Sequence, residues 1–172
     1  MIRHPHYTPD FQLDSGDIRI RFKQKDDVSF VRAEMVGDRI VFYYQSTEVF
    51  KDDDIQIWIW KTLKEFGRKR VKEKLVPRLL KMAKERGLKV NNVRASSAKG
   101  RWGSCSSKCN INLSLYLAFL PTHLQNYVIQ HELTHLIEMN HSPRFWARLD
   151  EVLEGKAKAL RREIRGLNFS FV

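Results

Sequence analysis

The sequence predicts an α+β fold that forms a single domain over residues 1–172. Short runs of β-branched and aromatic residues near the N-terminus predict a small antiparallel sheet. A long basic stretch with apolar residues at helical spacing follows, and a leucine- and isoleucine-rich helix that carries ionisable groups comes after it. A chain of 172 residues is long enough for one sizeable core, whereas two full domains would fit only tightly.

Composition narrows the class of protein. With 42% hydrophobic and 30% charged residues, the chain has the composition of a soluble globular protein. No run of about eighteen apolar residues is present, so we expect no membrane-spanning helix, and the first residues lack the apolar core of a secretory signal. The only cysteines are Cys105 and Cys109, which is too few for a disulfide framework and favours a reducing compartment. We therefore expect a cytoplasmic protein that does not engage membranes.

Residues 1–50 are expected to hold the N-terminal sheet region. The runs "DIRIRFKQ" and "RIVFYYQ" are typical of strands, and a turn is predicted at Gly37-Asp38, between the second of these runs and the strand-like "VRAEMV" before it. Together these segments predict an antiparallel sheet over residues 17–45. The three acids of "KDDD" then suit the N-terminus of a helix, where negative charge is favourable.

A long basic helix is predicted next. Apolar residues recur at helical spacing from Ile55 to Met82, which predicts one helix, or two that meet near Pro77, ending before Gly87. Residues 51–100 hold 15 of the 31 Lys and Arg but only 6 of the 20 Asp and Glu. Such charge over residues 61–89 could bind a phosphate backbone weakly, but no nucleic-acid motif accompanies it. We interpret the charge as the solvated face of a scaffold helix.

The signature region is predicted over residues 90–154. The stretch "NNVRASSAKGRWGSCSSKCNINLSLYLAFLP" predicts a strand, a turn-rich connection and a second strand, which together form a hairpin. Helices are predicted from about Pro121 to Met139, from Ser142 to about Leu153, and in the basic tail "KAKALRREIRGL". Two thiols do not complete a metal site, so Cys105 and Cys109 are interpreted as structural.

The segment "HELTHLIEMNH" contains the candidate metal-binding histidines and an adjacent glutamate. Helix positions i and i+4 share a face, so His131 and His135 can bind one metal ion, while Glu132 is placed to reach a water rather than the metal. On an unbroken helix, His141 would lie about 15 Å along the axis from His131. We therefore expect the chain to turn back at Asn140, which tolerates a left-handed helix stop, with Ser142 as the N-cap of the next helix.

Three neutral imidazoles would leave one position of a tetrahedral zinc ion open to water, as in catalytic sites. Hydrogen-bonded core histidines are the competing interpretation, which we disfavour because His and Glu are rarely buried without partners. Glu154 or Glu151 on the following helix could replace His141 as the third ligand. A metzincin site is disfavoured, because Glu138 replaces its glycine and no methionine follows to form its turn.

Residues 94–149 also resemble a known family, the YgjP-like metallopeptidases, which are related to the SprT and WLM types of zincin. The matching motifs are "RWGSCSS", "INL", "LP", "YVIQHELTHL" and "NHSPRFW". The resemblance implies a zincin-like fold with a buried HExxH helix, zinc bound by His131, His135 and His141, and catalytic Glu132. The sequence departs from the family pattern at Cys109, where glycine is usual, and at Gln125-Asn126, where an apolar-acidic pair is usual.

The predicted function is hydrolysis of peptide or protein substrates through a zinc-bound water, with Glu132 as general base. Arg101 and Trp102 are candidates for lining the substrate site, whereas Phe145 and Trp146 are expected in the core. We expect an extended peptide to pair with an edge strand, "NINLS". The alternative is a DNA-associated SprT-like protease, or a DNA-binding protein, that uses the basic helix 61–89.

Overall fold

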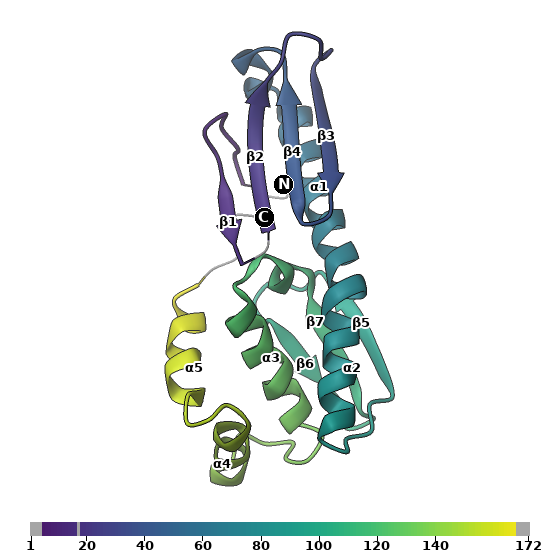
Figure 1. Cartoon of the computed structure of the whole chain (residues 1–172), viewed down its shortest axis with the longest axis vertical. Helices are drawn as coiled ribbons and strands as arrows, with labels where there is room; N and C mark the ends of the chain where they lie inside the picture. Colours follow the sequence, from purple (N-terminus) through teal and green to yellow (C-terminus); the bar gives the residue numbers. More distant parts are fainter. Residues whose placement is uncertain (1–4, 17, 168–172) are drawn as a thin grey trace. The chain divides into compact units, whose positions relative to one another are not determined.

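The computed structural model describes residues 5–16 and 18–167 (Figure 1). These residues form two compact units, one extending to Phe66 and the other beginning at Gly67. A single domain over the whole chain stays a prediction. Within the described ranges, no helix combines the length and apolar character needed to cross a membrane.

The first unit contains a four-stranded sheet. Its strands are β1 (Leu13–Ser15), β2 (Ile18–Gln24), β3 (Val31–Val36) and β4 (Arg39–Tyr44), in the order β1-β2-β4-β3 (Figure 1). The β1–β2 and β3–β4 pairs are antiparallel, but β2 and β4 are parallel. The prediction of a purely antiparallel sheet was therefore wrong, and the sheet is mixed.

Burial explains the strand order. Ile40, Phe42 and Tyr44 of β4 alternate inward and are buried, so this apolar strand lies between two neighbours. Strand β3 exposes Met35 and Val36 and lies at the edge. The predicted turn between β3 and β4 is confirmed, and Gly37 has a φ of 57°, which glycine adopts without steric cost.

The acids before the long helix act as predicted. A short 3₁₀ turn, η1 (Thr47–Lys51), leads into α1 (Asp53–Arg70). The Oδ1 atom of Asp52 accepts hydrogen bonds from the backbone N–H of Asp54 at 2.8 Å and of Ile55 at 3.4 Å. Asp52 therefore caps the N-terminus of α1, where backbone N–H groups have no partner within the helix.

The helix changes its winding just before Pro77. A π-helical segment, η2 (Val71–Leu75), separates α1 from α2 (Val76–Glu85), and the N–H of Val76 bonds to the carbonyl of Val71. A proline ring clashes with the carbonyl four residues earlier, and a wider turn relieves that clash. The prediction was one helix, or two that meet near Pro77; in the structure α1 and α2 are joined without a gap by η2, just before Pro77. Gly87, at a φ of 65°, follows the end of α2, as predicted.

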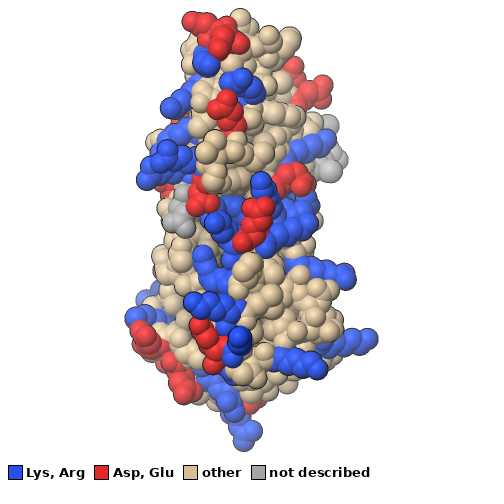
Figure 2. All heavy atoms as spheres, turned by 45° about the vertical axis from the view of Figure 1, so that its right-hand side comes forward, with Lys and Arg blue, Asp and Glu red and all other residues tan. Residues whose placement is uncertain are grey.

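Much of the charge on this helical stretch is solvated, with one clear exception. Lys72, Lys74 and Lys81 are exposed, and Figure 2 shows basic side chains interspersed with acidic ones and uncharged surface. Arg70 is the exception, because only 6% of it is exposed. The expectation that Arg70 belongs to a solvated basic face was therefore wrong.

The second unit contains a three-stranded sheet. Its strands are β5 (Asn92–Ser96), β6 (Gly103–Cys105) and β7 (Asn110–Ser114), in the order β5-β7-β6 (Figure 1). The hairpin is β6–β7, whereas β5 pairs with β7 in parallel, so the predicted hairpin of the first and last strands was wrong. Strand β7 is central because Ile111 and Leu113 are fully buried. It is therefore not the edge strand that was predicted for peptide binding.

The turn between β6 and β7 contains one departure from the family pattern, Cys109 in place of the usual glycine. Cys109 has a φ of 55°, in the left-handed region that favours glycine. This conformation explains why glycine suits the position. Both cysteines are free thiols, as expected for a chain without a disulfide framework.

Helices complete the second unit. After a fully buried 3₁₀ turn, η3 (Leu115–Phe119), come α3 (Thr122–Thr134), α4 (Pro143–Val152) and α5 (Ala157–Arg165). The predicted start of α4 is confirmed, because Ser142 Oγ accepts a hydrogen bond from the N–H of Phe145 at 3.3 Å and Pro143 opens the helix.

Two arginines of the basic stretch donate hydrogen bonds to side chains of α3. Arg78 Nη1 donates to Gln125 Oε1 at 2.9 Å and to Asn126 Oδ1 at 3.2 Å. Arg86 Nη1 donates to Gln130 Oε1 at 2.8 Å. The Gln125-Asn126 departure from the family pattern thus has a structural partner in Arg78, and part of the basic charge is used inside the fold.

Candidate active site

Helix α3 places two histidines side by side. His131 lies in its last turn and His135 caps its C-terminus with a helical φ of −63°, so the four-residue spacing still puts both rings on one face. The ring centroids are 4.9 Å apart. This is the arrangement that the HExxH spacing predicts.

The helix ends at Thr134, five residues before the predicted Met139. The Thr134 hydroxyl donates to the carbonyl of Gln130 at 2.7 Å, and the N–H of Leu136 bonds to the carbonyl of Leu133, three residues back. Tight turns of this kind end a helix without a left-handed residue. Asn140 does not have a positive φ, so the predicted left-handed stop at Asn140 was wrong.

Because α3 ends at Thr134, the chain turns and places His141 next to the other two histidines. His141 Nε2 lies 3.0 Å from His131 Nε2, and the candidate ligand atoms of His131, His135 and His141 all lie within 4.8 Å of one another. Two ligands of a tetrahedral zinc ion lie about 3.3 Å apart, given bonds of about 2.0 Å. Over the described ranges, this is the only group of three or more His, Cys, Asp or Glu that could hold a metal ion.

The environment favours neutral imidazoles, which is the form that binds metals. The pKa of His131 is lowered to about 3, mainly by burial and in addition by His135, His141 and Arg161. Burial also lowers the pKa of His135. The Nδ1 atom of His135 lies 3.2 Å from the carbonyl oxygen of Glu138, so a proton there would leave Nε2 free to bind a metal.

Glu132 is buried beside the histidines. It is 5% exposed, and burial raises the pKa of its carboxyl to about 8, although Arg101 opposes the rise. Its Oε2 atom has no hydrogen-bond partner among the described residues. A buried carboxylate without a partner is costly, and a nearby cation would stabilise it. The site chemistry therefore fits a bound metal ion.

Gly103 of β6 provides the space for the Glu132 carboxylate. A Cβ atom at position 103 would lie 2.6 Å from Glu132 Oε1 and 2.7 Å from its Cγ, closer than real Cβ contacts. Only glycine fits here without displacing the carboxylate. Gly103 was not among the predicted site residues, although the glycine of "RWGSC" was a visible signal.

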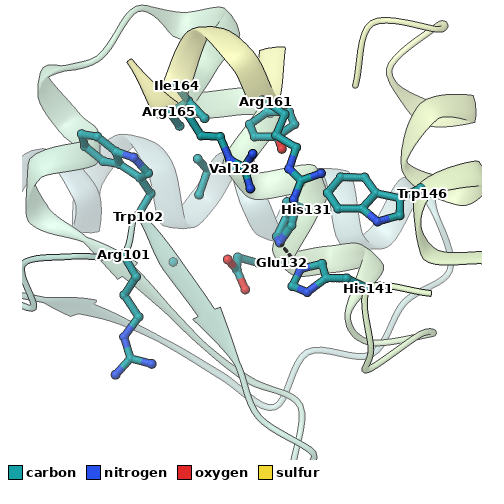
Figure 3. A pocket seen from close by; sticks show the side chains of 12 residues that line it. Arg101, Trp102, Val128, His131, Glu132, His141, Trp146, Arg161, Ile164 and Arg165 are labelled. Carbon is teal, nitrogen blue, oxygen red and sulfur yellow. Dashed lines mark hydrogen bonds between the residues drawn. The ribbon is translucent and has the colours of Figure 1, made fainter. Parts of the chain in front are cut away.

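Both predicted lining candidates lie at the site. Arg101 and Trp102 line a pocket of about 280 Å³ together with His131 and Glu132 (Figure 3). The Arg101 side chain is directed away from the histidines in this view. A role for either residue in contacting substrate stays a prediction.

The pocket is also lined by residues that were not predicted at the site. Phe145 is fully buried, as expected, but Trp146 is only half-buried and lines the pocket. Arg161 and Arg165 of α5 complete the wall (Figure 3). The guanidinium carbon of Arg161 lies 4.3 Å from the centroid of the Trp146 ring. The basic tail contained these arginines, but its pattern gave no sign that α5 borders the site.

The alternative third ligands lie elsewhere. Glu151 and Glu154 are exposed, and neither belongs to the histidine cluster. Glu154 instead pairs with Lys156 at 3.0 Å. The geometry therefore favours His141 as the third donor.

Comparison with known proteins gives one match. The family model described as YgjP-like, metallopeptidase domain matches residues 19–165, from β2 to the end of α5. No curated protein and no solved structure matches the chain significantly. The match covers the three histidines, Glu132 and Gly103.

Proposed function

The chain belongs to the YgjP-like metallopeptidase family, and on this premise we propose that it is a zinc-dependent peptidase with Glu132 as general base. The family implies a metal ion and peptide or protein substrates. The observation that carries the proposal is the convergence of three histidine donors within 4.8 Å, with a buried carboxylate on the adjacent residue.

The donor set supports zinc. His131, His135 and His141 offer three imidazole nitrogens and no hard oxygen ligand, which suits zinc better than magnesium or calcium. Zinc bound here would act as a Lewis acid that polarises a scissile carbonyl and lowers the pKa of a water molecule.

Glu132 would move the proton. Its raised pKa, about 8 without a metal ion, makes the carboxylate a stronger base than an exposed glutamate. Oε2 has no partner among the described residues and could accept a proton from the attacking water. The same carboxyl would then donate that proton to the leaving amine.

The edge strand β6 offers a place for the substrate backbone. The N–H of Ser114 bonds to the carbonyl of Trp102 at 2.8 Å, and the N–H of Ser106 bonds to the carbonyl of Asn110 at 2.9 Å. Because backbone groups alternate along a strand, those of Gly103 and Cys105 face away from β7. An extended peptide could pair with them next to Glu132.

Digestion of an unbiased peptide library with zinc-loaded protein tests the proposal. We expect the wild type to cleave internal or terminal peptide bonds and Glu132→Gln to cleave none while keeping its zinc. Cleavage by Glu132→Gln at the wild-type rate would remove Glu132 from the mechanism. Absence of cleavage by the wild type across the library would contradict the peptidase function.

A further inference from the structure

Two cations on α5, Arg161 and Arg165, line the pocket. Arg161 and Arg165 are four residues apart, so they share one face of the helix, where like charges repel. Among the described residues, neither forms an ion pair with a carboxylate. Glu163 is the only acid in α5, and it pairs with His123 at 2.7 Å.

Both guanidinium groups are directed toward the candidate metal site. Figure 3 shows them on the same side of the pocket as His131. Both arginines line the same pocket as Tyr127 and His131. Arg161 is further oriented by its stacking on Trp146, whose ring stacks on His141 with centroids 5.6 Å apart.

Of the described residues, Glu132 is the only acid that lines the pocket, and the proposed mechanism already uses it. The other lining groups near α5 are apolar or aromatic, including Val128, Ile164 and Trp146. A cationic substrate group would therefore meet two like charges. An anionic group would neutralise them.

We propose that Arg161 and Arg165 bind a carboxylate of the substrate beside the scissile bond. This inference rests on the peptidase function proposed above. A guanidinium group holds a carboxylate through two parallel hydrogen bonds, which gives both affinity and orientation. The carboxylate belongs either to an Asp or Glu side chain or to a free C-terminus. A pocket of about 280 Å³ has room for one such group rather than for a large ligand.

The first test compares matched substrates. Each library peptide is prepared with a free C-terminus and as its amide, and with Glu or Gln at each internal acidic position. Zinc-loaded wild type should cleave the carboxylate-bearing form about ten to one hundred times faster, judged by kcat/KM, because charge-assisted hydrogen bonds are lost in the neutral form. The acid-versus-amide and Glu-versus-Gln pairs separate the two sources. Equal rates for all pairs would overturn the inference while leaving the peptidase function intact.

Variants that remove one charge test whether Arg161 and Arg165 cause the preference for carboxylate-bearing substrates. Arg161→Gln and Arg165→Gln should each reduce the ratio of kcat/KM for the carboxylate form to kcat/KM for the neutral form to near one, because each removes one guanidinium group from the pocket. The matched control is Arg162→Gln, which removes a neighbouring exposed charge that does not line the pocket. An equal loss in Arg162→Gln would overturn the inference. Unchanged zinc content and melting temperature in all three variants would show that the fold is intact.

A binding measurement separates this inference from the peptidase function. Fluorescently labelled peptides are titrated with zinc-loaded Glu132→Gln protein, which should bind without cleaving, and anisotropy is followed. Tighter binding of the carboxylate form that Arg161→Gln abolishes in this background supports the inference, even if no peptide is cleaved by the wild type. Equal binding of both forms contradicts it, whatever the outcome for cleavage.

Discussion

Gly103 and Glu132 fit together so closely that a Cβ at position 103 would lie 2.6 Å from the carboxylate. Gly103→Ala should therefore displace the carboxylate, lower kcat by at least about tenfold, and reduce the free energy of unfolding by about 1–3 kcal/mol, as overpacking usually does. Zinc content should stay at the wild-type level, because the histidines are untouched. Kinetics, thermal unfolding and metal analysis measure the three effects.

Two further variants test whether the clash is with Glu132. Gly166→Ala is the control, since its Cβ would lie 3.4 Å from the nearest atom and its φ is −73°. Glu132→Asp shortens the acid, so adding Gly103→Ala to it should cost much less stability than in the wild type. A double-mutant cycle without coupling would show that the two residues do not interact.

His141→Ala should reduce zinc content below one ion per chain, or weaken zinc affinity strongly, because it removes one of three donors within 4.8 Å. Metal analysis after dialysis against a weak chelator measures the change. Glu154→Gln serves as the control and should keep full zinc content. Unchanged affinity in His141→Ala would exclude His141 as a ligand.

Cys105 should react slowly with alkylating reagents at neutral pH. The pKa of its thiol is raised to about 11, mainly by burial and in addition by Glu132 and Cys109, so roughly one thiol in a thousand is ionised at pH 8. In a Cys109→Ser variant, the alkylation rate should rise about tenfold per pH unit up to about pH 11. A plateau near pH 8.5 would show an ordinary exposed thiol.

Arg78→Met should reduce the free energy of unfolding by about 1–3 kcal/mol, because it leaves Gln125 and Asn126 without their donor. Lys74→Met removes the same charge from an exposed position and should change stability by less than about 0.5 kcal/mol. Chemical denaturation of both variants provides the comparison. Equal effects would mean that Arg78 does not support α3.

Duplex DNA should bind weakly, and only at low salt. Arg78 and Arg86 donate hydrogen bonds to α3 and Arg70 is buried, which leaves fewer cations free for phosphates than the sequence suggests. A salt titration of DNA binding should show loss of binding well below physiological salt. Tight binding near physiological salt, with cleavage that depends on DNA, would instead support the DNA-associated alternative.

Local signals in the sequence predicted local structure well. The Gly37-Asp38 turn, the Ser142-Pro143 helix start and the change of helix at Pro77 each follow from the conformational preferences of a few adjacent residues. The four-residue spacing of His131 and His135 likewise fixes their common face. These features depend little on the remainder of the fold.

Features that depend on distant residues were not predictable in the same way. The position of β4 between β2 and β3 reflects burial against the first unit's core, and the strand patterns alone are compatible with other orders. The end of α3 at Thr134 depends on turns that a helical pattern continuing to Met139 does not reveal. The approach of Gly103 to Glu132 joins residues 29 positions apart, which no spacing rule addresses.

The end of α3 at Thr134 also affects how tightly a metal ion can bind. His141 lies on an irregular segment between α3 and α4 rather than on a helix. Fixing one residue of such a segment costs about 1–2 kcal/mol of backbone entropy, so a more flexible segment would lower the affinity for a metal ion. A change that loosens the segment, such as Asn140→Gly, would therefore weaken metal affinity without altering any ligand. We therefore expect the metal affinity of the site to depend on the stiffness of this connecting segment as well as on the three donors.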